Sequence, residues 1–122
     1  MNLLESVEIH IALSRVATLH LPINEQSPSR IRFQILLQLA KAEFSSVPMS
    51  VKSLFASIPH SDTGIRKHFD ELLDEGWVVL DNHKDDRRIR YVKPSDQLVV
   101  CFKGWLVGCN KIFETMCQQH NV

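Results

Sequence analysis

The sequence predicts an α+β fold, mostly α, with a longer helix toward each end of the chain. Two short segments with an apolar stripe at helical spacing, 51–58 and 61–75, are separated by a turn that contains Pro59. Two runs rich in strand-forming residues, 77–80 and 89–92, follow directly and predict a β-hairpin. A helix-turn-helix followed at once by such a hairpin is a winged helix-turn-helix.

The size and composition of the chain are those of an ordinary globular domain. With 122 residues, 44% of them hydrophobic and 23% charged, a single domain over 1–122 is expected. Its predicted parts are an N-terminal helix and loop (1–28), the winged helix-turn-helix (29–94) and a C-terminal helix (95–122). No apolar run reaches about 18 residues, so no contact with a membrane is expected. The N-terminus lacks the basic flank of a secretory signal, and the cytoplasm is the expected location.

Positive charge is concentrated rather than abundant. The 14 basic and 14 acidic residues cancel, which counts against a purely electrostatic nucleic-acid binder. Within ten residues, however, only Asp85 and Asp86 oppose five cations: Lys84, Arg87, Arg88, Arg90 and Lys93. The sequence therefore predicts a local basic patch at the hairpin.

The first helix, expected over 2–20, has two apolar faces. One contains Leu3, Leu4, Val7 and Ile11, and the other contains Ile9, Leu13, Val16 and Ala17. A helix of this kind commonly packs on its own domain and on a partner as well. The last helix is expected from a Ser95 cap to about residue 118, where Gly104 and Gly108 leave a flat strip for another helix.

The second helix is expected over 29–44, with Ser29 as its N-cap and an apolar stripe that marks it as central. The linker 45–48 that follows leaves room for a short strand. Ser50 then caps the third helix, over 51–58.

Residues 61–78 contain the expected recognition helix. Ser61 is its predicted N-cap, and Gly76 suits its C-terminus. Its core face consists of Ile65, Phe69, Leu72 and Leu73, whereas Arg66 and Lys67 lie early on the opposite side. His68 is ambiguous, and a plain surface role is expected ahead of a contact with DNA. The polar residues 81–88 are expected to form the connection between the two hairpin strands.

These features resemble the MarR family of winged-helix transcriptional regulators over roughly residues 30–95. The match rests on LLDEGWV (72–78) and on the wing segment DDRRIRYVKPS (85–95), in which Pro94 departs from the usual apolar residue. The resemblance implies a homodimer formed through the N- and C-terminal helices. It also implies that Asp86 organises the wing and that Arg87 or Arg88 enters the minor groove of DNA. Family members typically couple DNA release to a small molecule or to thiol oxidation, but the shorter helices here make a sizeable effector pocket unexpected.

The expected function is sequence-specific binding of double-stranded DNA by a homodimeric transcriptional regulator on a pseudo-palindromic operator. The recognition helix (61–75) would enter the major groove and the wing (81–90) would lie at the minor groove. The residues expected to contact DNA or to organise the contact are Ser50, Lys52, Ser61, Thr63, Arg66, Lys67, Lys84, Asp86, Arg87, Arg88 and Arg90.

Other readings stay open at this point. Many domains contain helix pairs for packing alone, and a winged helix also serves as a protein-interaction module without DNA binding, which zero net charge favours. An enzyme is not expected, because the six histidines are scattered and no Gly-rich phosphate loop is present. No cofactor or metal is expected, since three cysteines without CxxC spacing signal neither zinc nor a disulfide framework. They are interpreted as buried or half-buried thiols, with redox sensing as the alternative.

Overall fold

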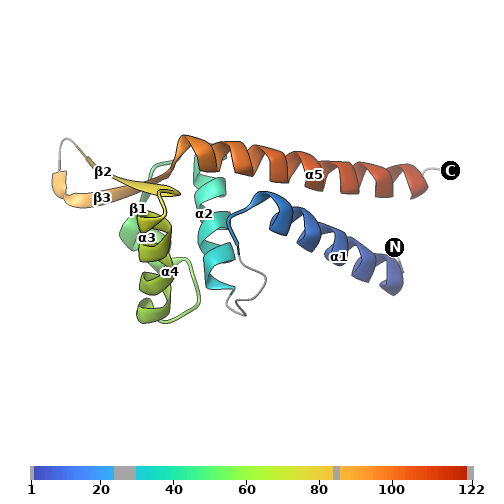
Figure 1. Cartoon of the computed structure of the whole chain (residues 1–122), viewed down its shortest axis with the longest axis horizontal. Coiled ribbons are helices and arrows are strands. Elements are labelled where there is room, and N and C mark those ends of the chain that lie inside the picture. Colours follow the sequence, from blue (N-terminus) through green and yellow to red (C-terminus); the bar gives the residue numbers. More distant parts are fainter. Residues whose placement is uncertain (1, 24–29, 84–85, 121–122) are drawn as a thin grey trace. The chain divides into compact units, whose positions relative to one another are not determined.

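The computed structural model describes residues 2–23, 30–83 and 86–120, together with all their side chains except those of 82–83, 86–87 and 118–120. Its elements follow in the order α1 (Leu3–His20), α2 (Ile31–Ser45), β1 (Met49–Ser50), α3 (Val51–Ala56), α4 (Asp62–Asp74), β2 (Val78–His83), β3 (Asp86–Pro94) and α5 (Asp96–His120) (Figure 1). The predicted α+β, mostly helical winged-helix fold is confirmed.

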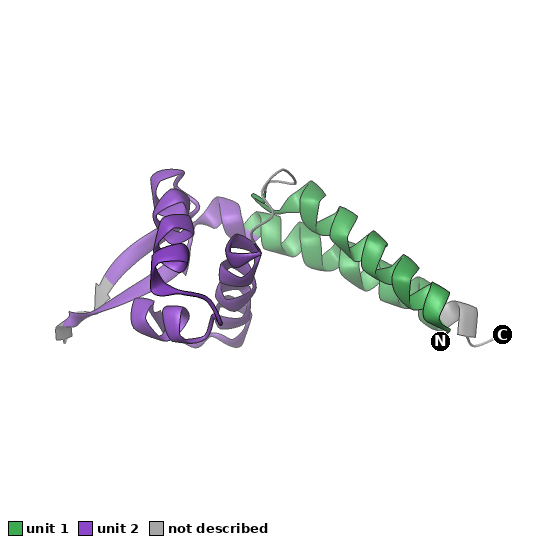
Figure 2. Ribbon diagram, turned by 90° about the horizontal axis from the view of Figure 1, so that it is seen from below, with its two compact units in different colours: residues 1–26, 100–122 green, residues 27–99 purple. Residues whose placement is uncertain are grey.

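The chain divides into two compact units (Figure 2). Residues 27–99 form the winged helix-turn-helix unit, and residues 1–26 with 100–122 form a second unit. The helix α5 belongs to both, since its first four residues lie in the winged helix-turn-helix unit. That 1–122 behaves as a single domain stays a prediction.

Residues from every helix and from two strands of the winged helix-turn-helix unit are buried. The fully or almost fully buried side chains are Ile35, Leu36, Leu39, Leu54, Ile65, Phe69, Leu72, Val78, Val92 and Leu98. Burial of a side chain of this size stabilises a fold by about 1.5–3 kcal/mol. The apolar stripes predicted for α2 and for the recognition helix are therefore the faces that are buried, although Leu73 is only half-buried.

The helix α4 is closed at both ends as its sequence predicts. The Ser61 hydroxyl accepts a hydrogen bond from the backbone N–H of Gly64 at 3.2 Å. At the other end Gly76 has a φ of +82°, the left-handed region that glycine enters without strain. The N–H of Gly76 donates to the Leu73 carbonyl and that of Trp77 to the Leu72 carbonyl, which is a Schellman motif.

The sheet is antiparallel and has the strand order β1-β3-β2. A short strand does follow α2, but it lies at Met49–Ser50, just after the linker 45–48 in which it is expected, and pairs Met49 with Val92 and Ser50 with Tyr91. The expectation that 81–88 is all connection is wrong. Asp81 and Asn82 continue β2 opposite Tyr91 and Arg90, and β3 already begins at Asp86. Backbone pairing along β3 extends the wing strands into residues whose own strand propensity is low.

Two smaller expectations about helix ends also differ from the structure. The N-cap of α2 is Arg30, whose side chain makes no capping hydrogen bond, and Ser29 lies outside the described residues. The helix α3 ends at Ala56 rather than at residue 58, although Ile58 is still buried.

In the other unit, α1 packs on α5 at the two glycines. A Cβ on Gly108 would lie 2.6 Å from a methyl of Val16, and a Cβ on Gly104 would lie 2.7 Å from Nδ1 of His20. Both distances are shorter than real Cβ contacts, so a larger residue at either position would force the side chain of His20 or Val16 to move. The flat strip predicted on the last helix is thus occupied by the first helix of the same chain.

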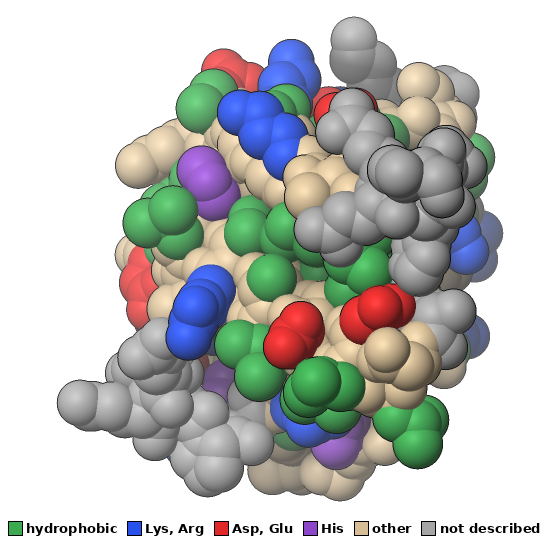
Figure 3. Space-filling model, turned by 90° about the vertical axis from the view of Figure 1, so that its right-hand side faces the viewer, with side chains coloured by type: hydrophobic (Ala, Val, Ile, Leu, Met, Phe, Trp, Pro, Cys, Tyr) green, Lys and Arg blue, Asp and Glu red, His purple; other side chains and the backbone are tan. Residues whose placement is uncertain are grey.

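The remaining face of α1 is apolar and exposed. Leu3, Leu4, Val7 and Ile11 are between 47% and 87% exposed, whereas Ile9 and Ala17 on the other face are buried. On α5, Val100, Val107 and Phe113 are at least 50% exposed. Figure 3 looks at the end where α1 begins and α5 ends, and shows hydrophobic side chains at the surface there. None of the described helices has the length and apolar character needed to cross a membrane.

Candidate nucleic-acid interface

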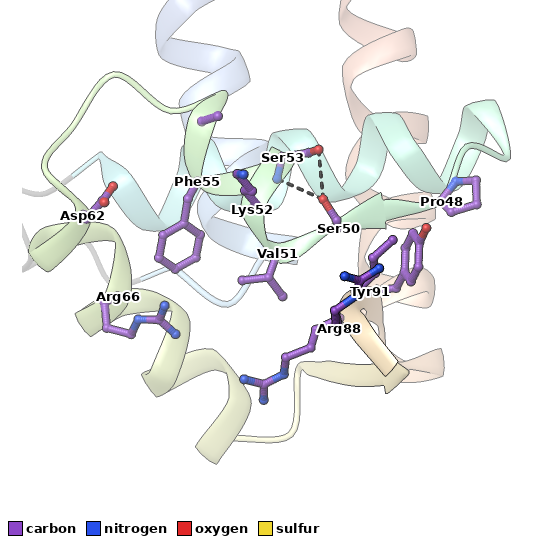
Figure 4. A pocket seen from close by; sticks show the side chains of 13 residues that line it. Pro48, Ser50, Val51, Lys52, Ser53, Phe55, Asp62, Arg66, Arg88 and Tyr91 are labelled. Atoms are coloured by element: carbon purple, nitrogen blue, oxygen red, sulfur yellow. Dashed lines mark hydrogen bonds between the residues drawn. The ribbon is translucent and has the colours of Figure 1, made fainter. Parts of the chain in front are cut away.

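A groove of about 850 Å³ lies between α3, the start of α4 and the strand β3 (Figure 4). The helix-turn-helix forms one side of it, and the wing strand forms the other. Its lining residues are Pro48, Ser50, Val51, Lys52, Ser53, Phe55, Ala56, Asp62, Arg66, Arg88, Ile89, Arg90 and Tyr91.

The charge in this groove is predominantly positive. Lys52, Arg66, Arg88 and Arg90 line it and are exposed, and they come from three different elements. Among the described lining residues Asp62 is the only carboxylate. Cations gathered over a concave surface create a positive potential that attracts a polyanion, even on a chain without net charge.

Arg66 is held against an aromatic ring. Its guanidinium carbon lies 4.7 Å from the centroid of the Phe55 ring, within the range of a cation–π contact. The Phe55 ring in turn meets Phe69 edge-on, with centroids 5.5 Å apart and an interplanar angle of 76°. Phe69 is only 1% exposed, so the contact connects Arg66 to the core of the unit.

The serine that begins α3 has its hydroxyl engaged in capping. Ser50 Oγ accepts the backbone N–H of Ser53 at 3.0 Å and donates to the hydroxyl of Ser53 at 2.9 Å (Figure 4). The caps predicted at Ser50 and Ser61 are confirmed, and both set where their helices begin.

Five of the predicted contact residues line the groove: Ser50, Lys52, Arg66, Arg88 and Arg90. Three others, Ser61, Thr63 and Lys67, are exposed in or just before the first turns of α4 but do not line it. Lys84 lies outside the described residues. Asp86 and Arg87 have a described backbone in β3, and their side chains lie outside the description.

The C-terminal part of α4 is attached to α2 by a cluster of charged groups. Arg32 donates to both carboxylate oxygens of Glu75, at 3.4 Å for Nη1 to Oε1, and its Nη1 lies 3.7 Å from Oε2 of Glu71. The Arg32 guanidinium, 16% exposed, holds the pKa of the Glu75 carboxyl below its usual value of 4.5. This cluster fixes the C-terminal end of α4 to α2.

The expectation that His68 has a plain surface role is wrong. Its side chain is only 12% exposed, and its Nδ1 lies 3.5 Å from Oε2 of Glu71. Within the described part of the chain this buried Nδ1 has no hydrogen-bond partner. The position of His68 on α4 turns its ring toward the charged cluster instead of toward solvent.

The cysteines differ in their surroundings. Cys109 is buried, which raises the pKa of its thiol and disfavours the reactive thiolate. Cys101 is half-buried and Cys117 is exposed. Within 2–23, 30–83 and 86–120, no group of three or more metal-ligating side chains is brought together.

Sequence reasoning missed several residues of the groove. By its spacing in the apolar stripe of 51–58, Phe55 is expected to face the core, yet it is half-buried and contacts Arg66. The groove is also lined by Asp62, Ile89 and Tyr91, which are not among the expected contact residues. The alternation of side chains along β3 could have indicated Tyr91 as a lining residue. The contact of Phe55 with Arg66 could not be predicted in this way, because it depends on the turn between α3 and α4.

The fold is that of MarR-family transcriptional regulators. The chain superposes on a MepR mutant from a multidrug-resistant S. aureus clinical isolate with a TM-score of 0.71 at 10% identity, over 93% of this chain and 76% of that one. For S. aureus MepR in complex with DNA the TM-score is 0.68 at 9% identity, over 95% and 87%. For the transcriptional regulator Tm0710 from Thermotoga maritima it is 0.66 at 11% identity, over 93% and 73%. No family model matches the sequence, and no curated protein does.

Proposed function

We propose that the protein is a transcriptional regulator that binds double-stranded DNA sequence-specifically, as a homodimer on a pseudo-palindromic operator. The observation that supports this most directly is the groove between the helix-turn-helix and the wing, with four cations from α3, α4 and β3. One of the structurally similar proteins was crystallised as a complex with DNA. Neither a catalytic residue nor a cofactor enters the proposal.

The first two turns of α4 would read bases in the major groove. Arg66 would donate two hydrogen bonds to a guanine, a contact that is worth about 1–3 kcal/mol of discrimination against another base. Thr63 and Lys67 are exposed on the same turns. Ser50, Lys52 and Ser61 would contact phosphates, which fix the register of the protein on the duplex.

The wing would lie at the minor groove. In this proposal Arg87 or Arg88 enters that groove, Asp86 organises the turn, and Lys84 and Arg90 add charge toward the phosphates. A narrow minor groove has an enhanced negative potential that attracts an inserted arginine.

The homodimer would form through the exposed apolar stripes of α1 and α5. Water-exposed leucine, valine and phenylalanine side chains in such number are typical of a surface that becomes covered. A two-fold dimer would set two recognition helices about 34 Å apart, one turn of B-DNA.

A gel-shift assay with a random duplex at low salt tests DNA binding against the rival reading, a protein-interaction module. We expect binding by the wild type and a loss of about 10-fold or more in Lys52→Ala/Arg88→Ala, since each phosphate contact contributes through counterion release. The control Lys41→Ala removes an exposed lysine from α2, away from the groove and from the proposed dimer helices, and should bind as the wild type does. No shift with any duplex at low salt would reject the proposed function.

A further inference from the structure

We propose that Phe55 of α3 is a positioning residue for base recognition, because its ring holds the Arg66 guanidinium in the orientation that reads a guanine. The inference rests on the proposed function and adds a residue that would not itself touch a base edge. It concerns α3, α4 and the groove between them, all within the winged helix-turn-helix unit.

Arg66 and Phe55 are in direct contact. Arg66 is exposed, so without a support its long side chain would sample many rotamers. The Phe55 ring lies 4.7 Å from the guanidinium carbon, and both residues line the groove, as Figure 4 shows. A planar guanidinium stacked on a ring keeps its N–H groups directed outward in one plane.

The Phe55 ring is itself held in place by the core. Phe55 is half-buried and meets Phe69 edge-on, and Phe69 belongs to the buried face of α4. The ring therefore rests on the same helix that carries Arg66. Arg66, Phe55 and Phe69 therefore form a continuous series of contacts from the groove to the core.

The orientation of the Arg66 guanidinium affects guanine recognition. A bidentate contact to guanine O6 and N7 needs two N–H groups in a fixed plane. Holding that plane before binding reduces the ordering that binding requires. A cation–π contact at an exposed site changes an equilibrium by about 2- to 5-fold, so removal of the ring should reduce guanine discrimination by about that factor.

The test compares Phe55→Leu, which keeps an apolar side chain without a ring face, with Phe55→Tyr, which keeps the face. For each, competition binding measures the ratio of affinities for the best duplex selected by the wild type and for the same duplex with the contacted guanine replaced by adenine. Phe55→Leu is expected to reduce this ratio about 2- to 5-fold, with the salt slope unchanged and Phe55→Tyr close to the wild type. In an Arg66→Ala background, Phe55→Leu should have no further effect on the ratio.

Three results would overturn the inference: an unchanged ratio in a folded Phe55→Leu variant, a ratio that rises because the ring had sequestered Arg66, or an equal loss in the Arg66→Ala background. The stack is also measured in the wild type by NMR, should Phe55→Leu fail to fold. The side-chain δ protons of Arg66 should lie upfield of those of the exposed Arg15, and coincident shifts would exclude the stack. If the wild type binds no duplex, the proposed function fails; if it binds selectively and only the Phe55 comparison fails, the inference alone is wrong.

Discussion

Single charged residues have two separate tasks in the winged helix-turn-helix unit. Arg66 and Arg88 are exposed in the groove, whereas Arg32 is largely buried between α2 and α4 and donates to Glu75. Removal of an exposed arginine should change DNA binding with little effect on stability. Removal of Arg32 should instead lower the stability of the fold with little direct effect on DNA binding, because it leaves Glu71 and Glu75 without their cation.

The pH dependence of stability tests the task of Arg32. The pKa of Glu75 is lower in the folded state than its usual 4.5, so its contribution is present above pH 4.5 and is lost as the pH falls through the folded pKa. Arg32→Gln should lower the free energy of unfolding at pH 7, and the difference from the wild type should shrink below about pH 4.5. Urea denaturation at pH 7 and pH 3 measures this, with Arg15→Gln as an exposed control. A difference that is the same at both pH values would contradict the assignment.

The two groove arginines are expected to differ in what they recognise. Arg66→Ala should relax sequence preference at one position by about 1–3 kcal/mol. Arg88→Ala should weaken binding to all sequences and lower the salt slope by about 1. Titrations of selected and random duplexes at several salt concentrations measure both quantities. Equal discrimination between bases by the wild type and by Arg66→Ala would contradict the role of α4 in base recognition.

At the scale of elements, the predictions that held were those with local causes. The ends of α4 follow from the Ser61 hydroxyl, which caps the first turn, and from Gly76, which adopts a left-handed backbone, and both residue types can be read from the sequence. The extent of the wing strands depends on pairing with β3, since Asp81 and Asn82 are poor strand formers by themselves. The burial of His68 similarly depends on an ion-pair cluster that α2 completes.

The residues of the candidate site likewise differ in whether the sequence predicts them. The basic residues Lys52, Arg88 and Arg90 could be predicted because charge in a wing and at a helix start is a sequence signal. The contact of Phe55 with Arg66 could not be predicted, because both an inward and a groove-facing Phe55 satisfy the same helical spacing. The turn between α3 and α4 determines which of the two Phe55 adopts.

The packing of α1 on α5 gives a prediction at the same scale. Gly108→Ala should destabilise the protein by about 1–3 kcal/mol through the clash with Val16, because a β-branched side chain cannot move aside cheaply. The higher helix propensity of alanine offsets about 1 kcal/mol of this. Thermal unfolding measures the change, with the exposed Asn110→Ala as a control in the same helix. The double variant Val16→Ala/Gly108→Ala should lose less than the sum of the two single variants, and strict additivity would argue against the contact.

At the scale of the whole molecule, the proposed homodimer involves both the exposed apolar face of α1 and the basic groove. A monomer would leave Leu3, Leu4, Val7 and Ile11 in water, whereas a two-fold dimer would cover them and pair two grooves. Half-site spacing, affinity and operator symmetry would then all depend on this interface.

The dimer is tested by placing charge on the stripe. Leu4→Glu/Val7→Glu should convert a dimer to a monomer and weaken operator binding by about 10-fold or more, because the two half-sites no longer bind as one unit. Sedimentation over a range of concentrations measures the mass, and Lys41→Glu is a charge-changing control on α2. A wild type that stays monomeric at all concentrations would contradict the proposal.

The most direct test of the central claim is selection of bound sequences from a random pool of duplex DNA. The account predicts enrichment of a two-fold symmetric motif, whose half-sites are centred about one helical turn apart and each contain a guanine that depends on Arg66. A pool that shows no enrichment after selection, or that enriches one asymmetric half-site, would contradict it.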